Sequence, residues 1–132
     1  MLPTDRYAVV LFGSAAIFNA AVAAALLCAR PQLAAAFGLD PIDGSDVVVA
    51  NLAGALVGLF GYAYLRLALD PLRYRVYAEL GAIGKLLAVA AADVPWLQGV
   101  IDWRLPLLAA GDLLFALLFI DWLRRTRSRT VT

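Results

Sequence analysis

Three ionisable side chains interrupt apolar stretches of this sequence, and they are the residues best placed to do chemistry. Glu79 and Lys85 lie in one apolar stretch, and Asp112 lies in the next. A carboxyl group can donate or accept a proton, and an ammonium can bind an oxyanion or shift the pKa of a nearby carboxyl. We therefore treat Asp112, Glu79 and Lys85 as candidate catalytic residues.

Amide and aromatic side chains extend this candidate site. Asn19 and Asn51 each lie on a helix face made of alanine and glycine, and the ring of Tyr62 can stabilise a cation. With Lys85 and Asp112, these three residues form the candidate ligand-binding set. We hypothesise that Lys85 pairs with Asp112 and that Asn19 or Asn51 hydrogen-bonds to the pair.

Depth estimates support that grouping. At ~1.5 Å per helical residue, Lys85 lies ~15 Å from the basic end of its helix, Asp112 ~18 Å and Asn19 ~20 Å. All three fall near the middle of a hydrocarbon core about 30 Å thick. Glu79 lies close to one edge instead, at a depth like that of Arg66 and Asp121, and we expect these three to form a second polar cluster.

A charge at mid-membrane depth requires a partner, because insertion costs on the order of 2.5–3.5 kcal/mol for each such residue. Two interpretations of the Lys85–Asp112 pair stay open. The pair can simply fix which helices pack together, or it can mark a ligand pocket, an ion path or a catalytic acid–base set.

Composition sets the fold class. The chain has 132 residues, of which 64% are hydrophobic and 16% charged, with a mean hydropathy of +0.83. Average soluble domains carry roughly 25% charged residues, and a small soluble fold cannot hide so much apolar surface. The sequence therefore predicts one all-α domain over residues 1–132, an integral membrane bundle of four transmembrane helices.

About 20 apolar residues cross a bilayer, and four segments are long enough. We predict helices over 7–29, 47–69, 75–94 and 104–124, a basic tail over 124–132 and a short interfacial helix over 32–37. Small residues on the second and third helices, including Gly54, Gly58 and Gly81, predict close approach of neighbouring helices. A cleaved signal peptide is the alternative for the first segment, but that apolar run exceeds the usual length of about 7–15 residues.

Several residue types are missing or rare. The chain has no histidine and one cysteine, Cys28, which argues against His-ligated haem, His-containing zinc sites and an internal disulfide. The net charge of +1 gives no reason to expect nucleic-acid binding. We predict no metal and no cofactor.

Basic residues are distributed unevenly between the two ends of the predicted helices. Arg30 and Arg104 belong to one side, and the other side holds Arg6, Arg66, Arg73, Arg75, Arg124, Arg125, Arg127 and Arg129. Because basic residues favour the cytoplasmic side, we predict that both termini are cytoplasmic.

The plan of the chain resembles the DoxX-like group of small four-helix bacterial membrane proteins. The similarity lies in a first span ending at Arg30-Pro31, a linker with Phe37-Gly38-Leu39, and Asn51 opening a glycine-rich second span before a short basic turn. The resemblance implies residence in the bacterial inner membrane and, from some members, association with redox or quinone-linked partners. It assigns no catalytic residue.

Three function classes follow. The first is a binding or accessory protein of the lipid bilayer, which holds a lipophilic ligand such as a quinone, or docks to a membrane-protein partner or to another copy of itself. The second is a membrane-embedded isomerase, cyclase or epoxide-opening enzyme that uses its Asp, Glu and Lys side chains. The third is a small dimeric transporter, although the first span lacks the acidic residue that small multidrug exporters carry.

Overall fold

The computed structural model describes residues 3–129, and this part of the chain is helical. Its elements are α1 (Pro3–Cys28), α2 (Arg30–Phe37), α3 (Asp46–Leu69), α4 (Arg75–Leu97), α5 (Arg104–Arg125) and a short 3₁₀ turn η1 (Arg127–Arg129). Of these, α1, α3, α4 and α5 are long and apolar enough to cross a membrane. The predicted all-α fold with four membrane-spanning helices is confirmed, and so is the short helix after the first span.

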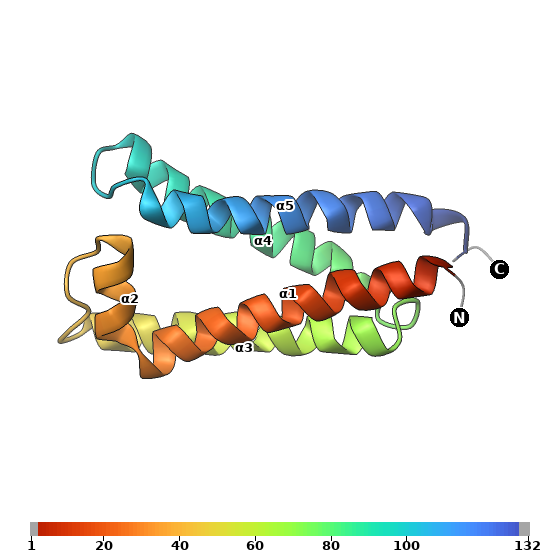
Figure 1. The fold of residues 1–132 in the computed structure, drawn as a ribbon, viewed down its shortest axis with the longest axis horizontal. Helices are drawn as coiled ribbons and strands as arrows, with labels where there is room; N and C mark the ends of the chain where they lie inside the picture. The colour runs from red at the N-terminus through yellow and green to blue at the C-terminus, as the bar shows by residue number, and fades with distance from the viewer. Residues whose placement is uncertain (1–2, 130–132) are drawn as a thin grey trace.

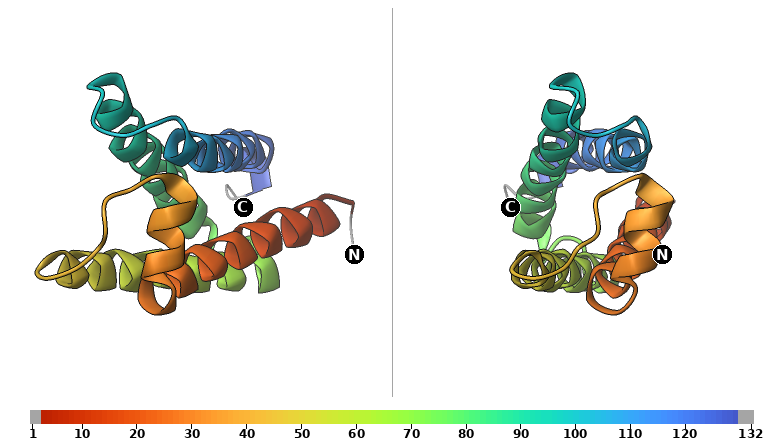
Figure 2. Two further views of the ribbon diagram at one scale, coloured as in Figure 1. Left: turned by 60° about the vertical axis from the view of Figure 1, so that its left-hand side comes forward. Right: turned by 90° about the vertical axis from the view of Figure 1, so that its left-hand side faces the viewer.

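The four long helices are arranged as two pairs, with α1 packed against α3 and α4 packed against α5 (Figures 1 and 2). Contacts between the pairs are much sparser than contacts within them. The pairs converge at the end that carries both termini and diverge at the other end, where α2 rises from the end of α1 toward the start of α5 (Figure 1).

Glycine explains the close packing within the first pair. Gly61 of α3 is buried, and a Cβ there would lie 3.2 Å from the Asn19 side chain and 3.5 Å from the Ala16 carbonyl oxygen of α1. A Cβ at Gly54 would come closer still, 2.8 Å from the Leu27 side chain of α1. The small-residue face predicted on this helix therefore does bring a neighbouring backbone close.

Large aromatic rings close the converging end of the bundle. The ring centroids of Phe12 in α1 and Phe119 in α5 are 4.9 Å apart, and Trp122 meets Phe12 edge-on at 5.0 Å. Tyr64 of α3 lies edge-on to Phe119 at 5.2 Å. These rings are nearly fully buried, so one continuous core joins both helix pairs at this end.

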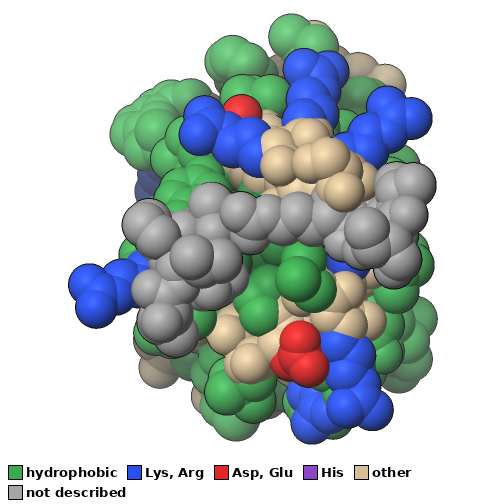
Figure 3. All heavy atoms as spheres, turned by 90° about the vertical axis from the view of Figure 1, so that its right-hand side faces the viewer, with side chains coloured by type: hydrophobic (Ala, Val, Ile, Leu, Met, Phe, Trp, Pro, Cys, Tyr) green, Lys and Arg blue, Asp and Glu red, His purple; other side chains and the backbone are tan. Residues whose placement is uncertain are grey.

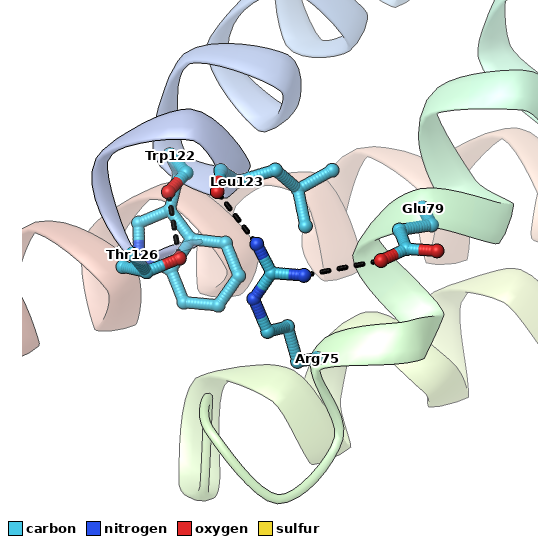
Figure 4. Close-up of polar contacts among 5 residues, drawn as sticks. All are labelled: Arg75, Glu79, Trp122, Leu123 and Thr126. Atoms are coloured by element: carbon cyan, nitrogen blue, oxygen red, sulfur yellow. Dashed lines mark hydrogen bonds and ion pairs between the residues drawn. The ribbon is translucent and has the colours of Figure 1, made fainter. Parts of the chain in front are cut away.

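Arg75 fastens the start of α4 to the end of α5 (Figure 4). Its Nη2 donates to the Leu123 carbonyl at 2.6 Å, and its Nη1 donates to Glu79 Oε1 at 3.0 Å. The Thr126 hydroxyl donates to the Trp122 carbonyl at 2.8 Å. Side chains thus donate to two carbonyl groups in the last turn of α5, where backbone donors run out.

The predicted second cluster of Glu79, Arg66 and Asp121 is wrong, because each of these residues has a different partner. Glu79 pairs with Arg75 one turn away, Arg66 donates to the Tyr74 hydroxyl, and Asp121 pairs with Arg125 at 2.8 Å. We grouped these three residues by their similar depth alone. Depth does not determine the direction in which a side chain leaves its helix, and the three side chains point to different neighbours.

At the diverging end, the chain just after α2 lies close to an ion pair at the start of α5. Arg104 donates to Asp102 at 2.6 Å, and this guanidinium lowers the pKa of Asp102 below its usual value. Gly38 caps α2 in the left-handed conformation, with φ of 63°. A Cβ at Gly38 would collide with the side chains of that ion pair, so only glycine allows the approach.

Helix α4 runs three residues further than predicted. The predicted helix ended at residue 94, but the helix continues through Pro95 to Leu97. Proline removes one intrahelical hydrogen bond and so ends many helices, but that loss is small within the last turn. The turn then closes at Gly99, whose φ is 75°.

Arginine side chains crowd the end of the molecule where the termini lie (Figure 3). The ends of α1, α3, α4 and α5 at this side contribute Arg6, Arg66, Arg75, Arg124 and Arg125. The opposite end holds Arg30 and Arg104. The fold therefore places these basic residues at the two ends to which the sequence assigned them. The side chain of Arg129 lies outside the described part of the structure.

Gly81→Ala tests the packing between the pairs. A Cβ at Gly81 would lie 2.5 Å from the Tyr64 ring and 3.1 Å from the Phe119 ring, both deeply buried. We expect a loss of about 1–3 kcal/mol in unfolding free energy, measured by denaturant titration in detergent micelles. Gly13→Ala is the control, since a Cβ there has no neighbour within 4 Å; an equal loss in both variants would contradict the packing argument.

Candidate ligand-binding site

A buried polar cluster joins three helices halfway along the bundle. Lys85 Nζ of α4 donates to Asp112 Oδ1 of α5 at 2.6 Å and to Asn19 Oδ1 of α1 at 3.1 Å. The Asn19 amide nitrogen in turn donates to the Val57 carbonyl of α3 at 3.1 Å. The predicted pairing of Lys85 with Asp112, and the role of Asn19 beside it, are confirmed.

Burial makes this cluster electrostatically strong. The side chain of Lys85 is 3% exposed and that of Asp112 is 18% exposed. The ammonium also lies 5.1–5.3 Å from the ring centroids of Phe18, Tyr64 and Phe115, where the negative ring faces attract a cation. One carboxylate, one amide and three rings thus replace the water that the ammonium loses.

A cavity of about 430 Å³ opens beside the cluster, between the two helix pairs. The lining residues that carry polar atoms are Asn19, Lys85, Asp112 and Tyr64. The remaining walls are apolar: Phe18, Val22, Leu26, Ala53, Leu56, Val57, Phe60, Gly84, Ala88, Ala91, Ala92, Leu105, Leu108 and Ala109. Ligand pockets have this size and this pattern, mostly apolar with a few polar groups that fix orientation.

Part of the cavity wall is exposed on the side of α3 and α4. Leu56 of α3 lines it and is 49% exposed, and Ala88 and Ala91 of α4 line it and are exposed as well. These three residues lie well inside their membrane-spanning helices. The exposed part of the cavity wall on α3 and α4 therefore lies within the segments that are long and apolar enough to cross a membrane.

Three of the predicted site residues lie outside the cluster. Asn51 is exposed and accepts a hydrogen bond from Arg30 at 3.0 Å. Tyr62 is 57% exposed on the outer surface, and the side chain of Glu79 is 57% exposed beside Arg75. The structure therefore does not bring Asn51, Tyr62 or Glu79 together with Lys85 and Asp112, because a shared face within one helix does not say which neighbour that face meets.

Sequence reasoning missed the aromatic residues around Lys85. Phe115 follows Asp112 by one helical turn, and Tyr64 follows Gly61 by one turn, so each shares a face with a residue that was recognised. That spacing was the available signal. This spacing indicates Tyr64, and not Tyr62, as the tyrosine near Lys85. The side chain of Tyr62 lies on the exposed outer surface.

Comparisons with protein-family models, with curated proteins and with solved structures found no match to this chain. The class of protein therefore rests on the fold and the site alone. It is a small multi-pass α-helical membrane protein whose two helix pairs are joined by a buried lysine, aspartate and asparagine beside a mostly apolar cavity.

A double-mutant cycle measures how the charges are coupled. Lys85→Met and Asp112→Leu each leave one unpaired charge in the bundle, so we expect each to lower the unfolding free energy by about 3–5 kcal/mol. The double variant removes both charges and should lose much less than the sum. Denaturant unfolding in micelles gives the four values.

The exposed pair of Asp121 and Arg125 supplies the matched control cycle, because exposed ion pairs contribute little. The changes in unfolding free energy caused by Asp121→Asn and by Arg125→Gln should add up to the change in the double variant. Additive losses at Lys85 and Asp112 as well would contradict direct coupling between the buried charges.

Proposed function

We propose that this protein binds a lipophilic small molecule, which it takes from the bilayer into the cavity between its helix pairs. The observation that carries the proposal is the placement of the polar cluster in the wall of an otherwise apolar cavity that opens between α3 and α4. Apolar walls favour the body of a lipophilic molecule, and the few polar groups fix its orientation.

The energetics of the ion pair support a binding role. Replacing a buried ion pair by apolar residues of similar volume is often neutral or stabilising. Helix packing alone therefore gives little reason to keep Lys85 and Asp112 charged. A polar group presented to a ligand inside the membrane does give such a reason, because intramembrane ionisable residues mark functional sites.

The resemblance to DoxX-like proteins adds a quinone to the lipophilic molecules that fit this description, together with a redox-linked membrane partner. We keep membership of that group as part of the proposal. In this interpretation the protein holds a bilayer-soluble molecule for a partner complex, and its cavity is the point of exchange.

Acid–base chemistry on the bound molecule is the second candidate function, and the position of Asp112 favours it. The carboxylate lines the cavity while Lys85 holds it at 2.6 Å, so a proton can pass between a ligand and this pair. Glu79 and Tyr62 lie outside the cavity, which leaves Asp112 and Lys85 as the catalytic candidates for an isomerase-type reaction.

Ala91→Phe tests the binding proposal, because it places a large ring at the cavity opening. Wild-type protein purified in lipid nanodiscs should carry a lipophilic molecule that organic extraction and mass spectrometry detect at close to one per protein. Ala91→Phe should lose it by at least about tenfold. Ala90→Phe, on an exposed position next to it that does not line the cavity, should retain the molecule. Equal amounts in both variants would contradict binding in this cavity.

We also propose that the protein lies in the bacterial inner membrane with both termini in the cytoplasm. Arginines gather at the end where α1 begins and α5 ends, as the positive-inside rule requires for a cytoplasmic side. The opposite end carries α2 and Arg30, and faces the periplasm in this orientation.

Cysteine labelling tests this topology. In a Cys28→Ala background, Ser45→Cys places a thiol before α3 and Ser128→Cys places one after α5, both on exposed residues. A membrane-impermeant maleimide should label Ser45→Cys in spheroplasts, and label Ser128→Cys only after lysis, because the bilayer excludes the reagent. The reverse pattern would show the opposite orientation.

A further inference from the structure

We infer that the cavity selects a neutral amphiphile with a hydroxyl or carbonyl head, and that Tyr64 contacts this head together with Lys85 and Asp112. The inference rests on the proposed function and narrows the chemical class of the ligand. It adds a binding residue, Tyr64, that lies in the cavity wall on the opposite face of α3 from Tyr62.

Charge balance is the first argument. The ammonium of Lys85 and the carboxylate of Asp112 are 2.6 Å apart, and together they carry no net charge. An anionic head would compete with Asp112 for the ammonium, and a cationic head would compete with Lys85 for the carboxylate. Either ligand leaves one buried charge uncompensated, whereas a neutral head does not.

Unused hydrogen-bonding capacity is the second argument. Lys85 has three donors, of which Asp112 and Asn19 take two. Asp112 accepts through Oδ1, and within residues 3–129 its Oδ2 has no hydrogen bond, although the side chain is reachable at 18% exposure. Asn19 uses both its oxygen and its nitrogen, so it positions the ammonium and offers nothing further.

The third argument is the hydrogen-bonding capacity of the Tyr64 hydroxyl. This residue is 1% exposed and lines the cavity, and its hydroxyl makes no hydrogen bond to the described part of the chain. Its ring is fixed by Phe119 on one side and lies 5.3 Å from the Lys85 ammonium. A ligand oxygen that reaches this hydroxyl therefore gains a hydrogen-bond donor that no described group uses.

These three groups match one oxygen of an alcohol or a phenol. Such an oxygen accepts from Lys85 or Tyr64 and donates its proton to Asp112 Oδ2; a carbonyl oxygen uses the donors alone. The apolar chain attached to that oxygen then lies against the alanine and leucine walls and leaves between Leu56 and Ala91.

The effect of the head group is measured with four probes that share a ten-carbon chain and differ in the group at its end: 1-decanol, decyl sulfate, decyltrimethylammonium and decane. The sulfate and the quaternary ammonium keep their charge, because neither can exchange a proton. Each probe is equilibrated at low concentration with full-length protein in nanodiscs of zwitterionic lipid. Mass spectrometry then counts bound probe, and subtraction of the Ala91→Phe value removes the bilayer background.

We expect cavity occupancy by 1-decanol to exceed that of either charged probe by at least about tenfold, since a buried uncompensated charge is costly. The cavity occupancy of 1-decanol should also exceed that of decane, because only decanol can form hydrogen bonds with the polar groups of the cavity. Tyr64→Phe should lower decanol occupancy about two- to tenfold and leave decane unchanged, since it removes one hydrogen bond and keeps the ring. Tyr62→Phe, on the lipid-facing surface, should change neither.

The outcomes separate the inference from the proposed function. If a charged probe binds best, or if decane binds as well as decanol, the cavity holds lipophilic molecules but the inference on the head group is wrong. If Tyr64→Phe and Tyr62→Phe behave alike, Tyr64 is not a binding residue. If no probe exceeds the Ala91→Phe background, the proposed function fails as well.

Discussion

A charged lysine halfway through the hydrocarbon region is the constraint on which this structure depends. Lys85 cannot face lipid, so its helix must turn that side inward and find compensating groups. One compensating group comes from its own helix pair, namely Asp112 on α5, and the other comes from the second pair, namely Asn19 on α1. Because α4 and α5 form one pair while α1 belongs to the other, this small polar cluster joins two halves that otherwise make few contacts.

Side-chain size decides where the halves touch and where they separate. Toward the termini the pairs are joined by the rings of Phe12, Phe119 and Trp122, which fill the space between four helix backbones. Beyond Lys85 the facing side chains include Ala88 and Ala92, which are too small to fill it. The polar cluster lies at the boundary between the filled end and the hollow end, so the groups that hold the bundle together are also in the cavity wall.

The sequence predicted the helices and the central pair because both follow from strong, local physical terms. Long apolar runs require membrane-spanning helices, and a lysine and an aspartate at equal depth attract each other. Which helix faces meet depends instead on three-dimensional packing: Asn51 shares its face with glycines yet accepts a hydrogen bond from Arg30. The same limit applies to Ala88, since small residues indicated close packing and here line a void. Tyr64 could have been placed from its spacing to Gly61, but no local rule distinguishes a ring in a core from a ring beside a cavity.

The void changes how the Lys85–Asp112 pair should be understood. An ion pair sealed on all sides only holds helices together, and apolar side chains of similar volume do that at less cost in desolvation. Here Asp112 and Tyr64 line a cavity whose wall is exposed at Leu56 and Ala91. Polar groups in such a cavity interact strongly with any oxygen that reaches them, because no water competes. Under the proposed function, the low dielectric that makes the lysine costly to insert also favours a ligand that needs no net charge to bind.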